Sequence, residues 1–157
     1  LDVFNMALGQ GVIEASPLMI TKIMATIANN GIMRDPLLVK EIISQDGEII
    51  KSFDNNTERK VVDQEINKMV QSLLEEVTAT GTAKSKDGQD NSHIAGKTST
   101  AQNGRLYPHS WFGGYFPVDN PKYAMTVFVE EGGSGSGIAY PLFYKISKKI
   151  LELGERN

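Results

Sequence analysis

The 157-residue chain contains no cysteine, so a disulfide framework and a cysteine-based metal site are both excluded. It contains no apolar run of the ~20 residues that a membrane-spanning helix needs. Its formal net charge is −3, which presents no basic field to nucleic acid or to anionic lipid. The first residue is Leu1 and not methionine, so we expect a piece of a longer chain whose targeting segment lies elsewhere.

What the chain does contain is the composition of one globular domain. Hydrophobic residues make up 40% and charged residues 22%, and the length allows a sizeable core. We find no internal repeat and no linker. Apolar spacing, capping residues and turn signals predict helices at residues 16–30, 64–79 and 141–151, and strands at 37–43, 48–53, 93–101, 110–116 and 123–130.

The order of these elements predicts an α+β fold. The last three strands are joined by short connections, which favours an antiparallel meander covered by helices. Asp-Gly between the first two strands indicates a hairpin turn at Ser44–Gly47. We expect a polar loop at Asp54–Lys60 and a flexible Gly/Ser connector at Glu131–Gly137.

One stretch within the predicted meander has the residues for chemistry. Gly96 permits close approach to the backbone, Lys97 supplies a positive charge, and Thr98, Ser99 and Thr100 supply hydroxyls. Small and β-branched residues favour a strand here, and such a strand could hold an anionic or carbonyl group. The alternative is a threonine-rich strand whose lysine is only solvated.

Other patterns are weaker. A phosphate-binding loop ending in Gly96-Lys97-Thr98 would need glycine where the chain has Asn91, and it should open a helix. His93 and His109 each neighbour a serine, but neighbours on a strand point to opposite faces, and two histidines make a poor metal site. Glycines at 133–137 precede a helix and could hold an anion, although a connector is the simpler interpretation.

Taken together, four stretches resemble the C-terminal part of the transpeptidase domain of penicillin-binding proteins, the serine DD-transpeptidase family. Ala95–Gln102 resembles the family's AGKTGTAQ strand, and Thr80-Gly81-Thr82-Ala83-Lys84 resembles the loop before it. Residues 9–31 resemble the family's GQG…TPL…AN-G helix region, and residues 111–123 resemble the next strand and its turn. Val129–Gly133 resembles the class B, cell-elongation type of penicillin-binding protein more than other members of the family.

The resemblance implies roles for this strand. Lys97 would give electrostatic and proton-network support to a catalytic serine, and Thr98 and Thr100 would contact the carboxylate of the substrate or of a β-lactam. The backbone N–H of Thr100 would be one of two oxyanion-hole donors. The family has glycine at the position of Ser99, so the substrate-binding cleft is expected to be reshaped there. The resemblance implies no metal and no organic cofactor.

Two family motifs are absent. No serine is followed by lysine three residues later, and none by asparagine two residues later, so the chain lacks both S-x-x-K and S-x-N. We therefore expect residues 1–157 to be the C-terminal portion of one transpeptidase domain, inactive alone and exposing an apolar face that favours oligomers. The parent would lie at the extracytoplasmic face of the bacterial membrane. A β-lactam sensor and a non-catalytic binding domain of the same fold stay open as alternatives.

Overall fold

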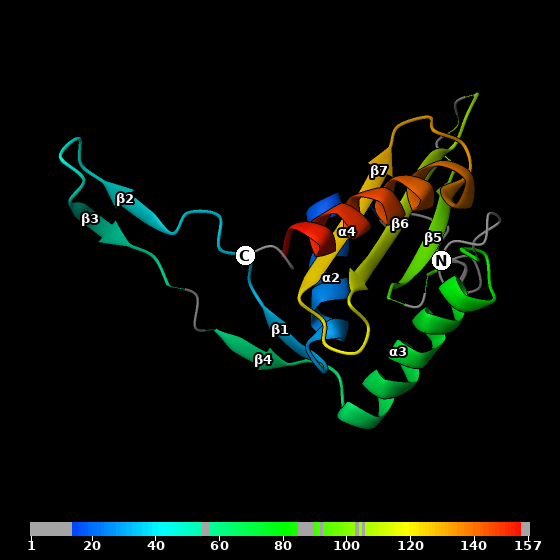
Figure 1. Cartoon of the computed structure of the whole chain (residues 1–157), viewed down its shortest axis with the longest axis horizontal. Coiled ribbons are helices and arrows are strands. Elements are labelled where there is room, and N and C mark those ends of the chain that lie inside the picture. Colours follow the sequence, from blue (N-terminus) through cyan, green and yellow to red (C-terminus); the bar gives the residue numbers. More distant parts are fainter. Residues whose placement is uncertain are drawn as a thin grey trace.

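The computed structural model describes residues 14–54, 57–84, 90–91, 93–102, 104 and 106–154. The predicted helices and strands are present in the predicted order, and the structure adds two short strands and a π-helical turn that were not predicted. Figure 1 shows a compact body from which a thin arm extends. In chain order they are α2 (Pro17–Ala28), β1 (Ile32–Arg34), β2 (Glu41–Ile43), β3 (Ile49–Ser52), β4 (Glu58–Lys60), α3 (Gln64–Ala79), β5 (Ala95–Ala101), β6 (His109–Phe116), β7 (Tyr123–Val129), a π-helical turn (Gly135–Ala139) and α4 (Tyr140–Gly154).

The predicted meander is confirmed as the centre of the body. β5, β6 and β7 form one antiparallel sheet in that order. Thr98 lies opposite Phe112, and Phe112 lies opposite Val127. The first strand begins at Ala95 and not at 93, so His93 precedes the sheet in a turn.

Aromatic side chains fill the face of the sheet under α4. Phe112, Phe116 and Phe143 are fully buried, and the Phe143 ring lies edge-on to both others at 4.6 and 5.6 Å. Phe112 and Phe116 are four residues apart on β6, so strand geometry puts both on one face. Because aromatic rings bury large apolar areas, this layer is the main core of the molecule.

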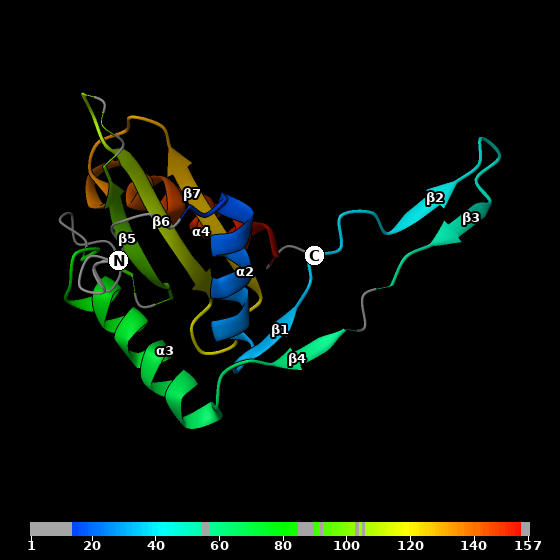
Figure 2. The same cartoon turned by 180° about the vertical axis from the view of Figure 1, so that it is seen from behind.

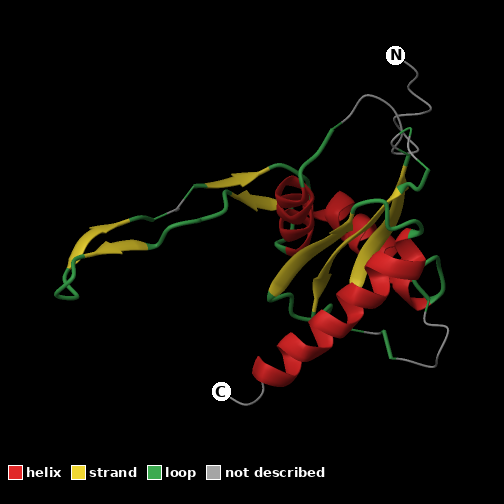
Figure 3. Ribbon diagram, turned by 90° about the horizontal axis from the view of Figure 1, so that it is seen from above, coloured by secondary structure: helices red, strands yellow, loops and turns green. Residues whose placement is uncertain are grey.

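The opposite face of the sheet is covered by α2. Met24 packs with Ala95 and Tyr115, and a Cβ at Gly113 would lie 2.8 Å from the Ile20 side chain. The missing side chain at Gly113 therefore lets the helix approach the sheet. Figure 3 shows helices on both sides of the strands, so the predicted α+β arrangement is confirmed.

The helix ends follow the predicted capping signals. Ser16 accepts a hydrogen bond from the Met19 N–H at 3.2 Å at the start of α2, and Gly31 takes φ +81° after its end. Helix α3 spans the predicted residues. Asp63 occupies its N-cap position, but the side chain pairs with Lys60 at 2.9 Å and makes no capping hydrogen bond.

The arm, residues 32–60, corrects two predictions. Glu58–Lys60, expected in a polar loop, is strand β4 and pairs with β1. The predicted strand 37–43 is strand only over Glu41–Ile43. All three residues of β4 are exposed, so the strand has no alternation of apolar and polar residues that the sequence could reveal. Proline at position 36 lacks a backbone N–H, which disfavours strand pairing just before this run.

The tip of the arm is the predicted hairpin. The Gly47 N–H donates to the Ser44 carbonyl at 3.2 Å, and Gly47 adopts φ +84°. Figure 2 shows β2 and β3 lying away from the body. Their apolar side chains are consequently exposed, with Ile50 retaining 66% of its accessible surface.

The connector predicted over Glu131–Gly137 contains regular structure at its end. It enters a π-helical turn at Gly135, and Gly135 is buried. The following helix α4 begins one residue earlier than predicted and ends three residues later, at Gly154. In the described part of the chain, no helix has both the length and the apolar character needed to cross a bilayer.

Candidate active-site strand

Strand β5 presents Lys97–Thr100 at an edge of the sheet. It pairs with β6 on one side, and no described strand pairs with its other side. Side chains alternate along a strand, so Lys97 and Ser99 lie on the α2 face, whereas Thr98 and Thr100 lie on the α4 face. The four candidate residues therefore form two pairs along one edge.

Lys97 is solvent-exposed and lies along the open edge. Its Nζ donates to the backbone carbonyl of Thr98 at 2.9 Å, which places that carbonyl on the side of β5 away from β6. Backbone groups alternate in direction along a strand, so the N–H of Thr100 points to the same side. One edge thus gathers an ammonium group and outward-directed backbone groups.

Thr98 is nearly covered, with 8% of its surface exposed. Its Oγ1 lies 2.8 Å from the Oγ1 of Thr82, which belongs to the turn after α3. A hydrogen bond between two hydroxyls fixes the χ1 rotamer of a β-branched side chain that has few rotamers available. The Thr98 hydroxyl is therefore held by a residue 16 positions earlier in the chain.

Thr100 is held by the π-helical turn. The N–H of Gly135 donates to its Oγ1 at 3.2 Å. A Cβ at Gly135 would collide with the carbonyls of Ser99 and Trp111, so the turn sits directly on β5 and β6. This contact is possible only because residue 135 is glycine.

Ser110, opposite Thr100 in the sheet, secures the same turn. It is fully buried, donates to the Ser134 carbonyl at 2.9 Å and accepts from the Ala139 N–H at 3.0 Å. Both capacities of the hydroxyl are used, which makes the attachment of the turn to β6 specific.

Ser99 stands where the resembled family has glycine. Positive backbone φ angles among the described non-glycine residues occur at Asn30 and Glu131 and not at Ser99, so the serine is free of left-handed backbone strain. Its side chain is exposed on the same face as Lys97 and lies opposite Trp111 in the register. Trp111 contacts Phe128 at a ring distance of 4.3 Å. The extra hydroxymethyl group therefore narrows the lysine side of the edge and not the threonine side.

Helix α3 covers only the beginning of the open edge. Thr78 Oγ1 donates to the Ile94 carbonyl at 2.6 Å, and Leu74 packs on Ala95. Beyond these contacts Lys97, Ser99 and Thr100 are exposed. The accessible part of the edge therefore contains three of the four candidate residues, and the fourth, Thr98, is buried between them.

The histidines are placed apart from this chemistry. His93 is half-buried, and its ring lies 5.9 Å from that of Tyr144. Burial lowers the pKa of His93, with a smaller opposing effect from Asp90. His109 Nδ1 accepts from the Glu131 N–H at 3.0 Å. Ser110 lies on the opposite face from His109, as predicted, whereas Ser92 and the Gly9-Gln10-Gly11 stretch lie outside the described residues.

Most of the backbone N–H groups of the glycine-rich turn are engaged within the chain. Gly135 donates to Thr100, Gly137 and Ile138 donate to Ser134, and Ala139 donates to Ser110. These four donors are therefore not directed at an anion. Among the described residues, no cluster of three or more histidine, aspartate or glutamate side chains is placed to hold a metal ion.

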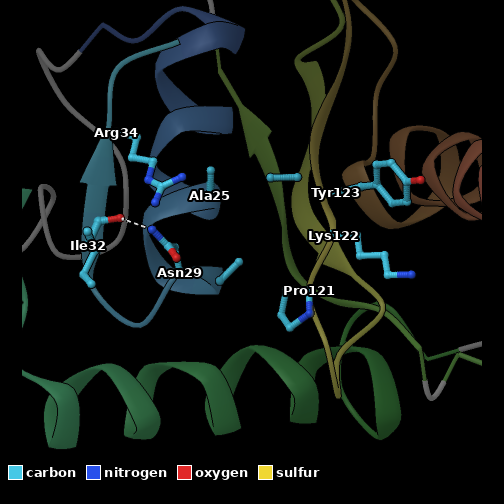
Figure 4. Close-up of a pocket in the computed structure, with 9 residues that line it drawn as sticks. Ala25, Asn29, Ile32, Arg34, Pro121, Lys122 and Tyr123 are labelled. Atoms are coloured by element: carbon cyan, nitrogen blue, oxygen red, sulfur yellow. Dashed lines mark hydrogen bonds between the residues drawn. The ribbon is translucent and has the colours of Figure 1, made fainter. Parts of the chain in front are cut away.

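A separate pocket of about 230 Å³ lies between the end of α2, β1 and the β6–β7 turn (Figure 4). Asn29 closes part of it by donating to the Ile32 carbonyl at 3.0 Å. Its arginine, Arg34, is paired with Glu58. None of Lys97, Thr98, Ser99 and Thr100 lines this pocket, so it is distinct from the candidate edge.

Thr82, Ser110 and Gly135 are the residues that inspection of the sequence did not single out as individual site residues. Each acts on β5 through a contact with a distant part of the chain. Thr82 was included only within the stretch that resembles the family's loop, Gly135 only within the glycine-rich stretch 133–137, and Ser110 only as the neighbour of His109. No local pattern indicates that any of the three contacts β5 or secures the turn on it.

Comparisons with known proteins agree with this arrangement. The model of the penicillin binding protein transpeptidase domain matches residues 2–148. The chain is 29% identical to peptidoglycan D,D-transpeptidase MrdA of Haemophilus influenzae over 96% of its own length and 26% of that protein. It is 31% identical to peptidoglycan D,D-transpeptidase PbpA of Mycolicibacterium smegmatis over 87% of its length and 29% of that protein.

Solved structures give the same result. The penicillin G acyl-enzyme complex of penicillin-binding protein A from Mycobacterium tuberculosis matches with a TM-score of 0.81 and 28% identity, over 92% of this chain and 34% of that one. PBP2 of Pseudomonas aeruginosa in complex with WCK 5153 matches with a TM-score of 0.73 and 34% identity, over 90% of this chain and 31% of that one. The chain spans about a quarter to a third of the length of these relatives.

Proposed function

The chain belongs to the penicillin-binding protein transpeptidase family, and we propose that it forms one wall of the active-site cleft of a longer peptidoglycan DD-transpeptidase. That protein would cross-link stem peptides through a serine acyl-enzyme and would be acylated by β-lactams. We also propose that residues 1–157 are the C-terminal portion of a single transpeptidase domain, and their share of the relatives' length supports their being part of a longer protein.

The single observation that carries the proposal is the open edge of β5. A lysine, two threonine hydroxyls and the outward N–H of Thr100 lie within four consecutive residues of β5. Two segments outside the sheet, the turn after α3 and the π-helical turn, hold the two hydroxyls by hydrogen bonds. Rigid, preoriented donors are what stabilise charge that develops during acyl transfer. A strand with a merely solvated lysine would need none of these braces.

Each residue then has a role at this edge. Lys97 supports the nucleophilic serine electrostatically and within its proton network. Thr98 and Thr100 donate to the terminal carboxylate of the substrate or of the β-lactam, and the Thr100 N–H stabilises the oxyanion. Ser99 reshapes the cleft on the side of Lys97, which we expect to alter β-lactam affinity without removing the site.

The nucleophile would come from a part of the domain upstream of this chain. The chain has no S-x-x-K and no S-x-N motif, so it is inactive alone. The proposed acyl transfer requires no metal or cofactor. The upstream part also covers apolar residues that α2 leaves exposed, including Leu18, Met19 and Ile23. Without it, the isolated chain is expected to self-associate through this face.

We place the longer protein at the extracytoplasmic face of the bacterial membrane, where peptidoglycan is assembled. Its anchor would belong to a segment outside this chain. The names of the relatives support this location through their peptidoglycan substrate.

Labelling with a fluorescent penicillin tests the proposal. The longer protein is expected to become covalently labelled, and the isolated chain to remain unlabelled at equal concentration. Pre-incubation with unlabelled penicillin is the control for a specific acyl-enzyme. An unlabelled longer protein would overturn the enzyme assignment, and labelling of the isolated chain would show that the nucleophile lies within it.

A further inference from the structure

We propose that Thr82 is a positioning residue: its hydroxyl orients the Thr98 hydroxyl toward the carboxylate of the bound substrate. This inference rests on the proposed function and assigns a part of the recognition site to the turn after α3. The observation behind it is the 2.8 Å contact between the two Oγ1 atoms.

The chemistry of a hydroxyl explains how the orientation works. A threonine hydroxyl carries one proton and two lone pairs. If Thr82 donates to Thr98, the proton of Thr98 must be directed to another acceptor, and a carboxylate at the open edge supplies one. The reverse direction would use the Thr98 proton on Thr82 and would leave the carboxylate without that donor.

The turn that carries Thr82 is held on both sides. The Gly81 N–H donates to the Glu76 carbonyl at 3.0 Å, and the Ala83 N–H donates to the Val77 carbonyl at 3.0 Å. Ala83 is itself buried, with 1% of its surface exposed. A residue fixed between two anchored neighbours can hold a partner hydroxyl at a constant place.

Thr82 suits a test by substitution because it is exposed while its partner is buried. Replacing its hydroxyl by a methyl group in Thr82→Val keeps the side-chain shape and opens no cavity. Thr80, two residues earlier in the same turn, is a matched control, because its hydroxyl bonds to Glu76 and not to β5.

The experiment compares acylation of the longer protein by a penicillin and by the methyl ester of the same penicillin, which lacks the carboxylate charge. In Thr82→Val the Thr98 hydroxyl is no longer directed at the carboxylate. We expect the second-order acylation rate with the acid to fall by about tenfold, the size expected when the charge-assisted hydrogen bond from Thr98 is lost for lack of orientation. The ester is expected to react equally with wild type and variant. Thr82→Ser should restore the rate with the acid, and Thr80→Val should leave it unchanged.

The outcomes separate this inference from the proposed function. If wild type is acylated and Thr82→Val matches Thr80→Val, the positioning role is overturned while the enzyme assignment stands. Equal losses with acid and ester also overturn it, because they show a general structural effect. A wild type that neither compound acylates overturns the proposed function itself. If thermal melting shows that Thr82→Val does not fold, the acylation rates of Thr82→Ala and Thr82→Ser are compared in its place.

Discussion

Strand β5 and the arm both present strand edges to solvent, yet they are held in opposite ways. Thr98 and Thr100 of β5 are hydrogen-bonded to two segments outside the sheet, the turn after α3 and the π-helical turn. The hairpin β2–β3 lies away from the body, and its apolar side chains are exposed. The body therefore fixes the positions of individual donors, whereas the hairpin is a ribbon whose side chains make few contacts with the rest of the molecule.

Replacing the lysine of each region gives the largest expected contrast. In the longer protein, Lys97→Ala should lower the rate of acylation by penicillin about 10²- to 10⁴-fold, the range for loss of a group in the proton-transfer network. Lys51→Ala should leave the rate unchanged, because the Lys51 ammonium lies 4.7 Å from the Phe53 ring and belongs to strand β3 of the arm, which lies away from β5 (Figure 1). Acylation rates are measured with a fluorescent penicillin. Equal rates for the two variants would contradict the assignment of β5 as an active-site strand.

Truncating one apolar side chain in each region compares their contributions to stability. Phe143→Ala removes a fully buried ring and should lower the free energy of unfolding by about 3–5 kcal/mol. Ile50→Ala removes an exposed side chain at the arm and should change it by less than about 0.5 kcal/mol. Chemical denaturation of the longer protein measures both. A large loss in Ile50→Ala would mean that the arm is packed against another part of that protein.

A smaller effect concerns the pH dependence of stability through His93. The arm contains no histidine, so a histidine can make stability depend on pH only in the body. Burial lowers the pKa of His93 below its usual value near 6.5. The unfolded chain therefore binds a proton more readily, so this contribution to stability is complete above pH 6.5. It falls as the pH drops from there through the lowered pKa.

As the pH falls from 7.5 to 5, we expect the free energy of unfolding of wild type to decrease relative to that of His93→Gln. Urea denaturation at several pH values measures it, and acid effects common to both proteins cancel in the difference. A difference independent of pH would show that His93 is not desolvated in the folded protein.

The elements that were predicted well are those whose cause is local. Helix α3 has an apolar residue on nearly every turn of one side and ends before glycine, so its bounds follow from the sequence. The meander follows from β-prone runs with short connections. Strand β4 could not be predicted, because Glu58, Arg59 and Lys60 form a strand only through pairing with β1.

The candidate site divides in the same way. Lys97, Thr98 and Thr100 belong to a contiguous motif and could be named from the sequence. Their braces could not, because Thr82 and Gly135 lie 16 and 35 residues away from their partners. Hydrogen bonds between residues so far apart produce no recognisable pattern in the sequence. The face on which Ser99 lies likewise became clear only from the register with Trp111.

Gly135 has a consequence that reaches beyond its own turn. Its backbone packs against two carbonyl oxygens of neighbouring strands, so there is no room for even one methyl group between the turn and the sheet. Even alanine at this position would act as a wedge, lifting the turn and withdrawing the N–H that Thr100 receives. Substitution at residue 135 would thus disturb the reactive edge from behind, without adding or removing any group that meets the substrate.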